Sequence, residues 1–298
     1  MTTLTAVFLA IDIRKKTWSS SDDNWRFIVN ADGVDVVRQL FRPVAHFGEV
    51  WVTFASDFPA EGHAVVYAYG DMGIRGDLVP TEISIDGSAL NPSSLRIETL
   101  GADLLRTESI IAWGWDAAKA VVPLAANLSP PNISTDPDEG FTSIPLGLAE
   151  SGGDATTFTE VLVYIERTLD RNAGTEAPVS LRFVRADGTL VDSAGLDGFD
   201  KLASDHERSA DIWRLSGLAP LSRSDAAGPI VPTLRIDGPD NAQIARAVVF
   251  GLASGGMRPT MVPLVDFTAG DDGLSGWLGP NNGGDRDLRL PLCAAAMR

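Results

Sequence analysis

The sequence has little of the material from which most catalytic and metal sites are made. It contains one cysteine, Cys293, and only three histidines. A single cysteine excludes an intramolecular disulfide and a zinc site built from several thiolates. The motifs of serine hydrolases, of phosphate-binding glycine loops and of basic nucleic-acid surfaces are also absent. The sequence therefore contains no constellation that points to a particular catalytic chemistry.

Positive charge and long apolar segments are scarce as well. Lysine and arginine number 24 against 40 aspartates and glutamates, for a formal net charge of −16. Repulsion from phosphate predicts that nucleic acid is not a partner, whereas a cationic partner or bound metal ions fit the sign of the charge. No stretch reaches the length of a transmembrane helix, and the N-terminus has no signal-peptide pattern, so a cytoplasmic location is expected.

Turn formers and β-branched residues make up much of what is present. The 29 glycines and 18 prolines punctuate short runs rich in valine, isoleucine and aromatic residues. Two of these runs lead into Asp32-Gly33 and Asp187-Gly188, which are strong hairpin signals. The pattern predicts an all-β protein of antiparallel β-sandwiches, with short helices only at residues 34–41 and 102–111.

Short motifs of the first half return in the second half in the same order. The pairs are Ala31-Asp32-Gly33 with Ala186-Asp187-Gly188, Val79-Pro80-Thr81 and Ile85-Asp86-Gly87 with Val231-Pro232-Thr233 and Ile236-Asp237-Gly238, Val122-Pro123-Leu124 with Val262-Pro263-Leu264, and Ile144-Pro145-Leu146 with Leu290-Pro291-Leu292. A repeat of this length predicts two whole domains. We expect one sandwich over residues 1–149 and another over residues 150–298, related by internal duplication.

The spacing between two of these motifs differs between the halves. The segment from Gly87 to Val122 is longer than the segment from Gly238 to Val262. This difference predicts an insertion in a surface loop of the first half, in the segment that carries Trp113-Gly114-Trp115.

Four segments of the second half share a pattern with one known family of sandwiches. They are the turn at Asn172-Ala173-Gly174-Thr175, the segment from Leu196-Asp197-Gly198 to Trp213, the strand and acidic loop from Leu234 to Asn241, and Gly276-Trp277-Leu278. Together they resemble the PLAT domain, the lipoxygenase-homology β-sandwich, and the first half is a poorer match. The resemblance implies a non-catalytic domain that binds a lipid surface or a protein partner, in several members with calcium.

The family's calcium site can be mapped onto the second half. It falls on Asn172, the carbonyl oxygen of Gly174, Asp197 and Asp240. Calcium takes about six to eight oxygen ligands, usually with carboxylates from separate loops. Asn172 stands where an acid is expected and brings no charge. The alternative interpretation is that these residues hydrogen-bond their own turns.

One tryptophan of the first half is a candidate contact residue. Trp18 lies beside the polar loop that corresponds to the calcium loop of the second half. An indole ring at a loop tip is favoured at a membrane interface, although burial is the usual fate of tryptophan. Trp18 is therefore the predicted anchor for a membrane or partner.

An enzyme and a structural subunit are the alternatives to a non-catalytic interaction protein. The enzyme would be an acid–base cyclase or isomerase with an apolar pocket between the sandwiches, because domain interfaces favour such pockets. Trp113, Trp115 and Asp116 are its candidate pocket residues. The structural alternative is a subunit of an appendage or particle. No organic cofactor is expected on any of these hypotheses.

Overall fold

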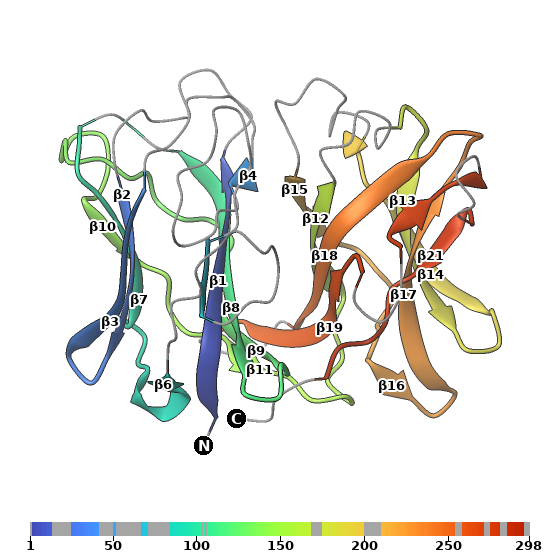
Figure 1. Cartoon of the computed structure of the whole chain (residues 1–298), viewed down its shortest axis with the longest axis horizontal. Coiled ribbons are helices and arrows are strands. Elements are labelled where there is room, and N and C mark those ends of the chain that lie inside the picture. Colours follow the sequence, from blue (N-terminus) through green and yellow to red (C-terminus); the bar gives the residue numbers. More distant parts are fainter. Residues whose placement is uncertain are drawn as a thin grey trace. The chain divides into compact units, whose positions relative to one another are not determined.

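The protein is built from antiparallel β-strands (Figure 1). A computed structural model describes residues 2–13, 25–41, 50–51, 67–70, 84–102, 104, 106–167, 175–199, 210–253, 258–270, 275–280 and 285–294. A short 3-10 turn, η1 (Gly87–Ala89), is the one helical element that lies wholly within these ranges. None of its described helical segments is long and apolar enough to cross a membrane. The prediction of an all-β protein is confirmed.

The chain divides into two compact units, Met1–Glu150 with the short segments Met257–Pro259 and Ala296–Arg298, and Ser151–Gly256 with Thr260–Ala295. Each unit contains two sheets, and each is described by itself below. The division falls inside the short strand β11 (Glu150–Ser151), which belongs to a sheet of the second unit.

The first unit has one sheet in the order β4-β1-β8-β9 and a second in the order β10-β7-β2-β3, with β5 and β6 also paired to β1. The strands are β1 (Thr3–Ile13), β2 (Trp25–Ala31), β3 (Val34–Phe41), β4 (Val50–Trp51), β5 (Tyr67–Gly70), β6 (Ile85–Asp86), β7 (Leu95–Thr99), β8 (Thr107–Asp116), β9 (Val121–Asn127) and β10 (Ser143–Pro145).

The second unit has one sheet in the order β11-β19-β18-β12-β15 and another in the order β14-β13-β17-β16, with β20 paired to β18 and β21 paired to β17. The strands are β12 (Glu160–Arg167), β13 (Val179–Arg185), β14 (Leu190–Gly195), β15 (Ala210–Leu215), β16 (Ser224–Asp225), β17 (Gly228–Ile236), β18 (Ala242–Ala253), β19 (Thr260–Thr268), β20 (Trp277–Leu278) and β21 (Asp287–Arg289).

The two units share a strand order. The path β4-β1-β8-β9 of the first unit corresponds to β15-β12-β18-β19 of the second, and β10-β7-β2-β3 corresponds to β21-β17-β13-β14. A register shift occurs at the same place in both, so that Trp113 lies opposite Pro123 and Phe250 lies opposite Pro263. A bulge suits a proline because it has no N–H to give to the ladder. A common origin of the halves remains a prediction.

The predicted Asp-Gly hairpins are present in both units. The turn between β2 and β3 contains Asp32 at φ 50° and Gly33 at φ 83°, and Gly188 between β13 and β14 has φ 89°. These left-handed conformations are the ones that match the twist of two paired strands.

One pair of repeated motifs does not occupy equivalent positions. Ile85 and Asp86 form β6, which pairs with β1, whereas Ile236 ends β17, which pairs with β13. Val79, Pro80 and Thr81 lie outside the described residues. The insertion predicted from this alignment is therefore wrong, and Trp113-Gly114-Trp115 belongs to strand β8 and not to a surface loop.

The last motif pair is displaced by two residues. The N–H of Leu146 donates to the carbonyl oxygen of Leu95, and the N–H of Leu290 donates to that of Pro232, on corresponding strands. Leu146 therefore corresponds to Leu290 and not to Leu292. Similar tripeptides that contain a proline can arise independently in two strands, so the hydrogen-bond partner decides the alignment.

The two predicted short helices are strands instead. Residues 34–41 form β3, paired along its whole length with β2, and residues 107–111 begin β8. The first segment contains three valines and the second ends in two isoleucines, and such residues lose little freedom in a strand but are restricted in a helix. Pairing with a neighbouring strand outweighed the weak helical periodicity.

The central strands have no exposed face. Residues 7–11 of β1 and residues 161–165 of β12 are fully buried at every position, and so are residues 247–250 of β18. Alternate residues of these strands, such as Val7 and Val161, pack in the core between the two sheets of their unit. The intervening residues, such as Phe8 and Leu162, are buried on the opposite face.

A glycine of β18 tests this packing. A Cβ on Gly251 would lie 2.6 Å from the ring of Phe158. We predict that Gly251→Ala lowers the free energy of unfolding by roughly 1–3 kcal/mol through overpacking, measured by urea denaturation. Gly153→Ala, which meets nothing within 4 Å, is the control and changes little. Phe158→Leu added to Gly251→Ala recovers part of the loss, and an additive double variant would contradict the contact.

Candidate functional site

Asp240 organises the loop between β17 and β18. Its Oδ2 accepts the backbone N–H of Glu176 at 2.8 Å, and its Oδ1 accepts that of Asn241 at 2.9 Å. Burial acts to raise the pKa of Asp240, but these two hydrogen bonds and one from Thr175 lower it below its ordinary value. The ionised carboxylate therefore fastens two chain segments that are distant in sequence.

The Asp197 loop is held by its backbone. Asp197 follows β14, and its carbonyl oxygen accepts the indole N–H of Trp213 at 2.9 Å. The Trp213 ring stacks on Phe199, with centroids 5.9 Å apart. The Asp197 side chain is exposed and is left to face solvent or a ligand.

The two loops border the same short segment of chain. Asp240 binds Glu176 directly, and the N–H of Leu196, next to Asp197, donates to the carbonyl oxygen of Val179 at 2.8 Å. The other two predicted ligands, Asn172 and Gly174, lie outside the described residues. Within the described ranges, no three histidine, cysteine or carboxylate side chains converge as a metal site. Calcium binding remains a prediction.

A third segment closes against the Asp240 loop. Strand β20 pairs with the start of β18, with Leu278 opposite Ala242. Gly279 follows at φ 116°, and a Cβ there would collide with the carbonyl oxygen of Asp240. Glycine is needed at this position because the backbone approaches closely in a left-handed conformation. The resemblance to the PLAT domain includes this Trp-Leu element, which the structure brings to the loop predicted to hold calcium.

The tryptophans predicted to line a pocket are packed against another aromatic ring. Trp113 is fully buried and lies parallel to Phe8, with centroids 5.2 Å apart. Trp115 meets the same ring edge-on at 4.8 Å, and the Lys119 ammonium lies 5.6 Å from the Trp115 ring. Stacked and edge-to-face contacts of this kind stabilise the fold.

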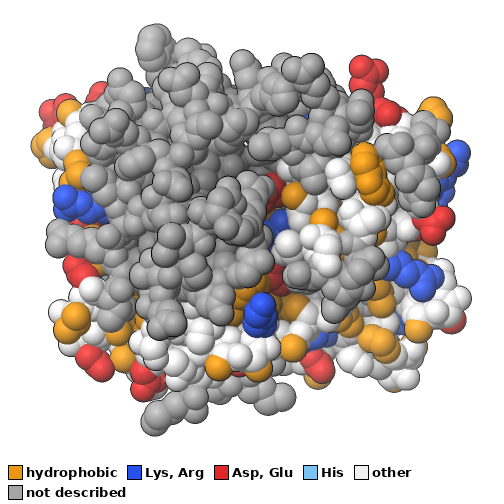
Figure 2. Space-filling view, in the orientation of Figure 1, with side chains coloured by type: hydrophobic (Ala, Val, Ile, Leu, Met, Phe, Trp, Pro, Cys, Tyr) orange, Lys and Arg blue, Asp and Glu red, His pale blue; other side chains and the backbone are white. Residues whose placement is uncertain are grey.

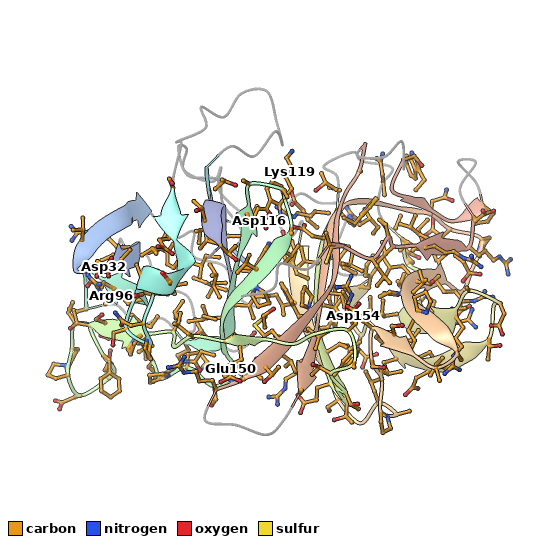
Figure 3. All side chains as sticks on the ribbon, turned by 90° about the horizontal axis from the view of Figure 1, so that it is seen from below. Asp32, Arg96, Asp116, Lys119, Glu150 and Asp154 are labelled. Carbon is orange, nitrogen blue, oxygen red and sulfur yellow. The ribbon has the colours of Figure 1, made fainter. Side chains whose placement is uncertain are left out.

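Asp116, the third predicted pocket residue, caps a turn. Its Oδ1 accepts the backbone N–H groups of Ala118 and Ala120, both at 2.8 Å. Figure 3 shows Asp116 and Lys119 near one another, and Lys119 has a left-handed φ of 58°. The carboxylate thus serves the hairpin between β8 and β9. Trp18, the predicted anchor, lies outside the described residues.

A buried ion pair in the second unit was not predicted from the sequence. Arg246 of β18 and Asp266 of β19 are bonded at 2.9 Å, and their side chains are 2% and 4% exposed. On the same face, Tyr164 donates to Glu166 at 3.3 Å, and Glu166 lies opposite Arg246 in the sheet. Each charge interrupts an apolar run of its strand, which is the sequence signal that predicts a buried partner.

The first unit has no ion pair at the corresponding positions. By register, Ser109 takes the place of Arg246, since Ser109 lies opposite Asp12 as Arg246 lies opposite Glu166. Ala126 likewise takes the place of Asp266. The same face carries the stacked Phe8 and Trp113 instead. The shared strand order therefore supports different chemistry in the two units.

No protein-family model, curated protein or solved structure matches the chain. The class of protein is therefore defined by the fold alone, as an all-β protein of antiparallel sheets in two units. Membership of the PLAT family remains a prediction from the motifs.

The Asp240 contacts predict a dependence of stability on pH. The folded-state pKa lies below the unfolded value near 3.9, so the carboxylate contributes stability above about pH 4 that is lost as the pH falls through the folded pKa. We expect Asp240→Asn to destabilise at about pH 7 and the difference from the parent to shrink toward about pH 3, in urea denaturation. Asp197→Asn is the control of equal charge change, and a pH-independent difference would contradict the assignment.

The buried ion pair predicts strongly non-additive substitutions. Arg246→Met or Asp266→Leu alone leaves one buried charge, and we expect a loss of about 3–5 kcal/mol in the free energy of unfolding. The double variant replaces both charges by apolar groups and recovers most of that loss. Equal and additive single losses, measured by denaturation, would show that the pair is not coupled.

Proposed function

We propose that the protein is a non-catalytic interaction protein. The loops around Asp197 and Asp240, at one end of the second sandwich, bind a lipid surface or a protein partner, with calcium as the bridging ion. The observation that carries the proposal is that both loops border residues 175–179, with the Asp240 carboxylate ionised between them. Carboxylates on separate loops at one place are the ligands that calcium prefers.

The contacts made by the candidate pocket residues Trp113, Trp115 and Asp116 favour an interaction protein over an enzyme. Trp113 and Trp115 pack on Phe8, and Asp116 accepts two backbone hydrogen bonds of its own turn. A general acid needs an unoccupied carboxyl group within reach of substrate. These contacts stabilise the hairpin between β8 and β9, and they weigh against a catalytic or pocket-lining role for the three residues.

Charge also supports a bridging cation. The formal net charge of −16 repels anionic headgroups, and a divalent cation reverses the sign locally. Figure 2 shows acidic and basic side chains interspersed among the described residues on the side of the molecule that is in view. The proposal places the ion-dependent contact at the loops and not on a broad charged face.

Calcium titration followed by calorimetry tests this function. We expect the full chain to bind calcium with a measurable heat, and Asp197→Ala with Asp240→Ala to abolish it, since both carboxylates are removed. Asp187→Ala, which removes a carboxylate from a hairpin turn, is the matched control and retains the heat. Absence of heat for the parent chain, or heat unaffected in the double variant, would rule out the proposed metal site.

A second titration identifies the partner class. The chain is mixed with vesicles of mixed neutral and anionic lipid, with and without calcium, and sedimentation is measured. Calcium-dependent sedimentation that is lost in the double variant supports a lipid surface. Calcium binding without sedimentation supports a protein partner.

A further inference from the structure

Besides Val34 in the hairpin between β2 and β3, two large apolar side chains are exposed among the described residues of the first unit. Leu100 is 44% exposed and Phe141 is 60% exposed. Leu100 directly follows β7, and Phe141 lies two residues before β10, the strand that pairs with β7. Both lie just outside the sheet β10-β7-β2-β3, at the end of β7 and before the start of β10, and neither is part of the core of the unit.

The register makes the two side chains one patch. Ser143 lies opposite Glu98, and the N–H of Thr99 donates to the carbonyl oxygen of Thr142 at 3.0 Å, which continues the pairing. Leu100 and Phe141 are the residues that adjoin this hydrogen bond on the two segments, and Phe141 forms a bridge with Ile133 on its other side. Side chains next to one hydrogen-bonded pair of residues can be covered by a single partner segment. We name Leu100 and Phe141 the Leu-Phe pair.

The backbone around the Leu-Phe pair is fixed on both sides. The N–H of Phe141 donates to the carbonyl oxygen of Asn132 at 3.0 Å, and Phe141 in turn accepts from the N–H of Ser134 at 3.1 Å. The N–H of Thr135 donates to the carbonyl oxygen of Gly101 at 3.0 Å. The exposed ring is therefore presented by an ordered segment, which reduces the entropy lost when a partner binds.

Carboxylates stand next to the Leu-Phe pair. Asp136, Asp138 and Glu139 lie in the turn that leads into Phe141, and Asp138 and Glu139 are exposed. The bond from Thr135 to Gly101 brings this turn beside Leu100. Residues 99–102 and 131–142 contain no lysine or arginine. An apolar contact flanked by negative charge attracts a partner that is apolar and positively charged.

We propose that the Leu-Phe pair is a docking site for a cationic protein segment. An apolar side chain of the partner packs on Leu100 and Phe141, and its neighbouring lysine or arginine residues lie over Asp138 and Glu139. The net charge of −16 disfavours both a second copy of this chain and an anionic membrane as the occupant. This inference rests on the proposed function as an interaction protein, and it adds a second surface and the chemistry of its partner.

A labelled peptide of alternating lysine and leucine tests the proposal by fluorescence anisotropy with the full chain. Leu100→Ser with Phe141→Ser is expected to weaken binding at least about tenfold, because the apolar contact is lost. Val34→Ser with Leu190→Ser is the matched control, since those residues are also exposed, at 64% and 45%, and it binds as the parent does. A peptide of alternating lysine and serine is expected not to bind.

Charge substitutions and exchange mapping complete the test. Asp138→Asn with Glu139→Gln is expected to weaken peptide binding a few-fold and to flatten its dependence on salt. Peptide-induced protection from hydrogen exchange is expected at residues 132–142 and 99–102, and not at residues 30–35.

Several results would overturn the proposal. They are parent-like peptide binding by the Leu100→Ser and Phe141→Ser variant, an equal loss in the Val34→Ser and Leu190→Ser control, or an effect of the patch variant on vesicle binding alone. The variant Asp197→Ala with Asp240→Ala separates the two proposals. If it loses peptide binding, the docking site is not the Leu-Phe pair, whereas its loss of calcium heat alone leaves both proposals standing.

Discussion

The burial of both faces of one sheet is the constraint on which each unit depends. Residues 7–11 of β1 and residues 161–165 of β12 have no exposed position, so every side chain along these strands must be accommodated by packing. One face packs on the second sheet of its unit, and the other holds Phe8 with Trp113 in the first unit. A charged side chain that is buried in such a sheet needs a buried partner of opposite charge, as Arg246 has in Asp266.

Because of this constraint, the side chains that are available to a partner lie at the strand ends and beside the second sheet of each unit. Asp197 and Asp240 lie in loops, where the Asp197 carbonyl oxygen accepts the indole N–H of Trp213 and the Asp240 carboxylate accepts the backbone N–H groups of Glu176 and Asn241. Leu100 and Phe141 adjoin the ends of the paired strands β7 and β10, and both are exposed. The candidate residues therefore lie in the loops and turns that the sheets carry, which is where binding residues are commonly found.

The strands and hairpins could be predicted from sequence because their signals are local. Asp-Gly turns specify left-handed backbone, and runs of β-branched residues predict most of the strands, although the helical spacing of residues 34–41 predicted a helix and was wrong. Strand identity is not local, and the repeated motif at Ile85 was misassigned because its partner is β1. The exposure of Phe141 was likewise not predictable, since it follows from the register of β10 on β7. The Arg246–Asp266 pair could have been predicted from the sequence, because each strand has one charged residue within an otherwise apolar run.

Native-state hydrogen exchange of the full chain tests the central claim most directly, because it measures which segments form the rigid frame. The amides of β1, β8, β12 and β18 are predicted to exchange most slowly, near the free energy of global unfolding. The loops around Asp197 and Asp240 and residues 132–142 are predicted to exchange through smaller openings. Slow exchange in those loops together with fast exchange in the central strands would contradict a frame of doubly buried sheets that presents its binding loops.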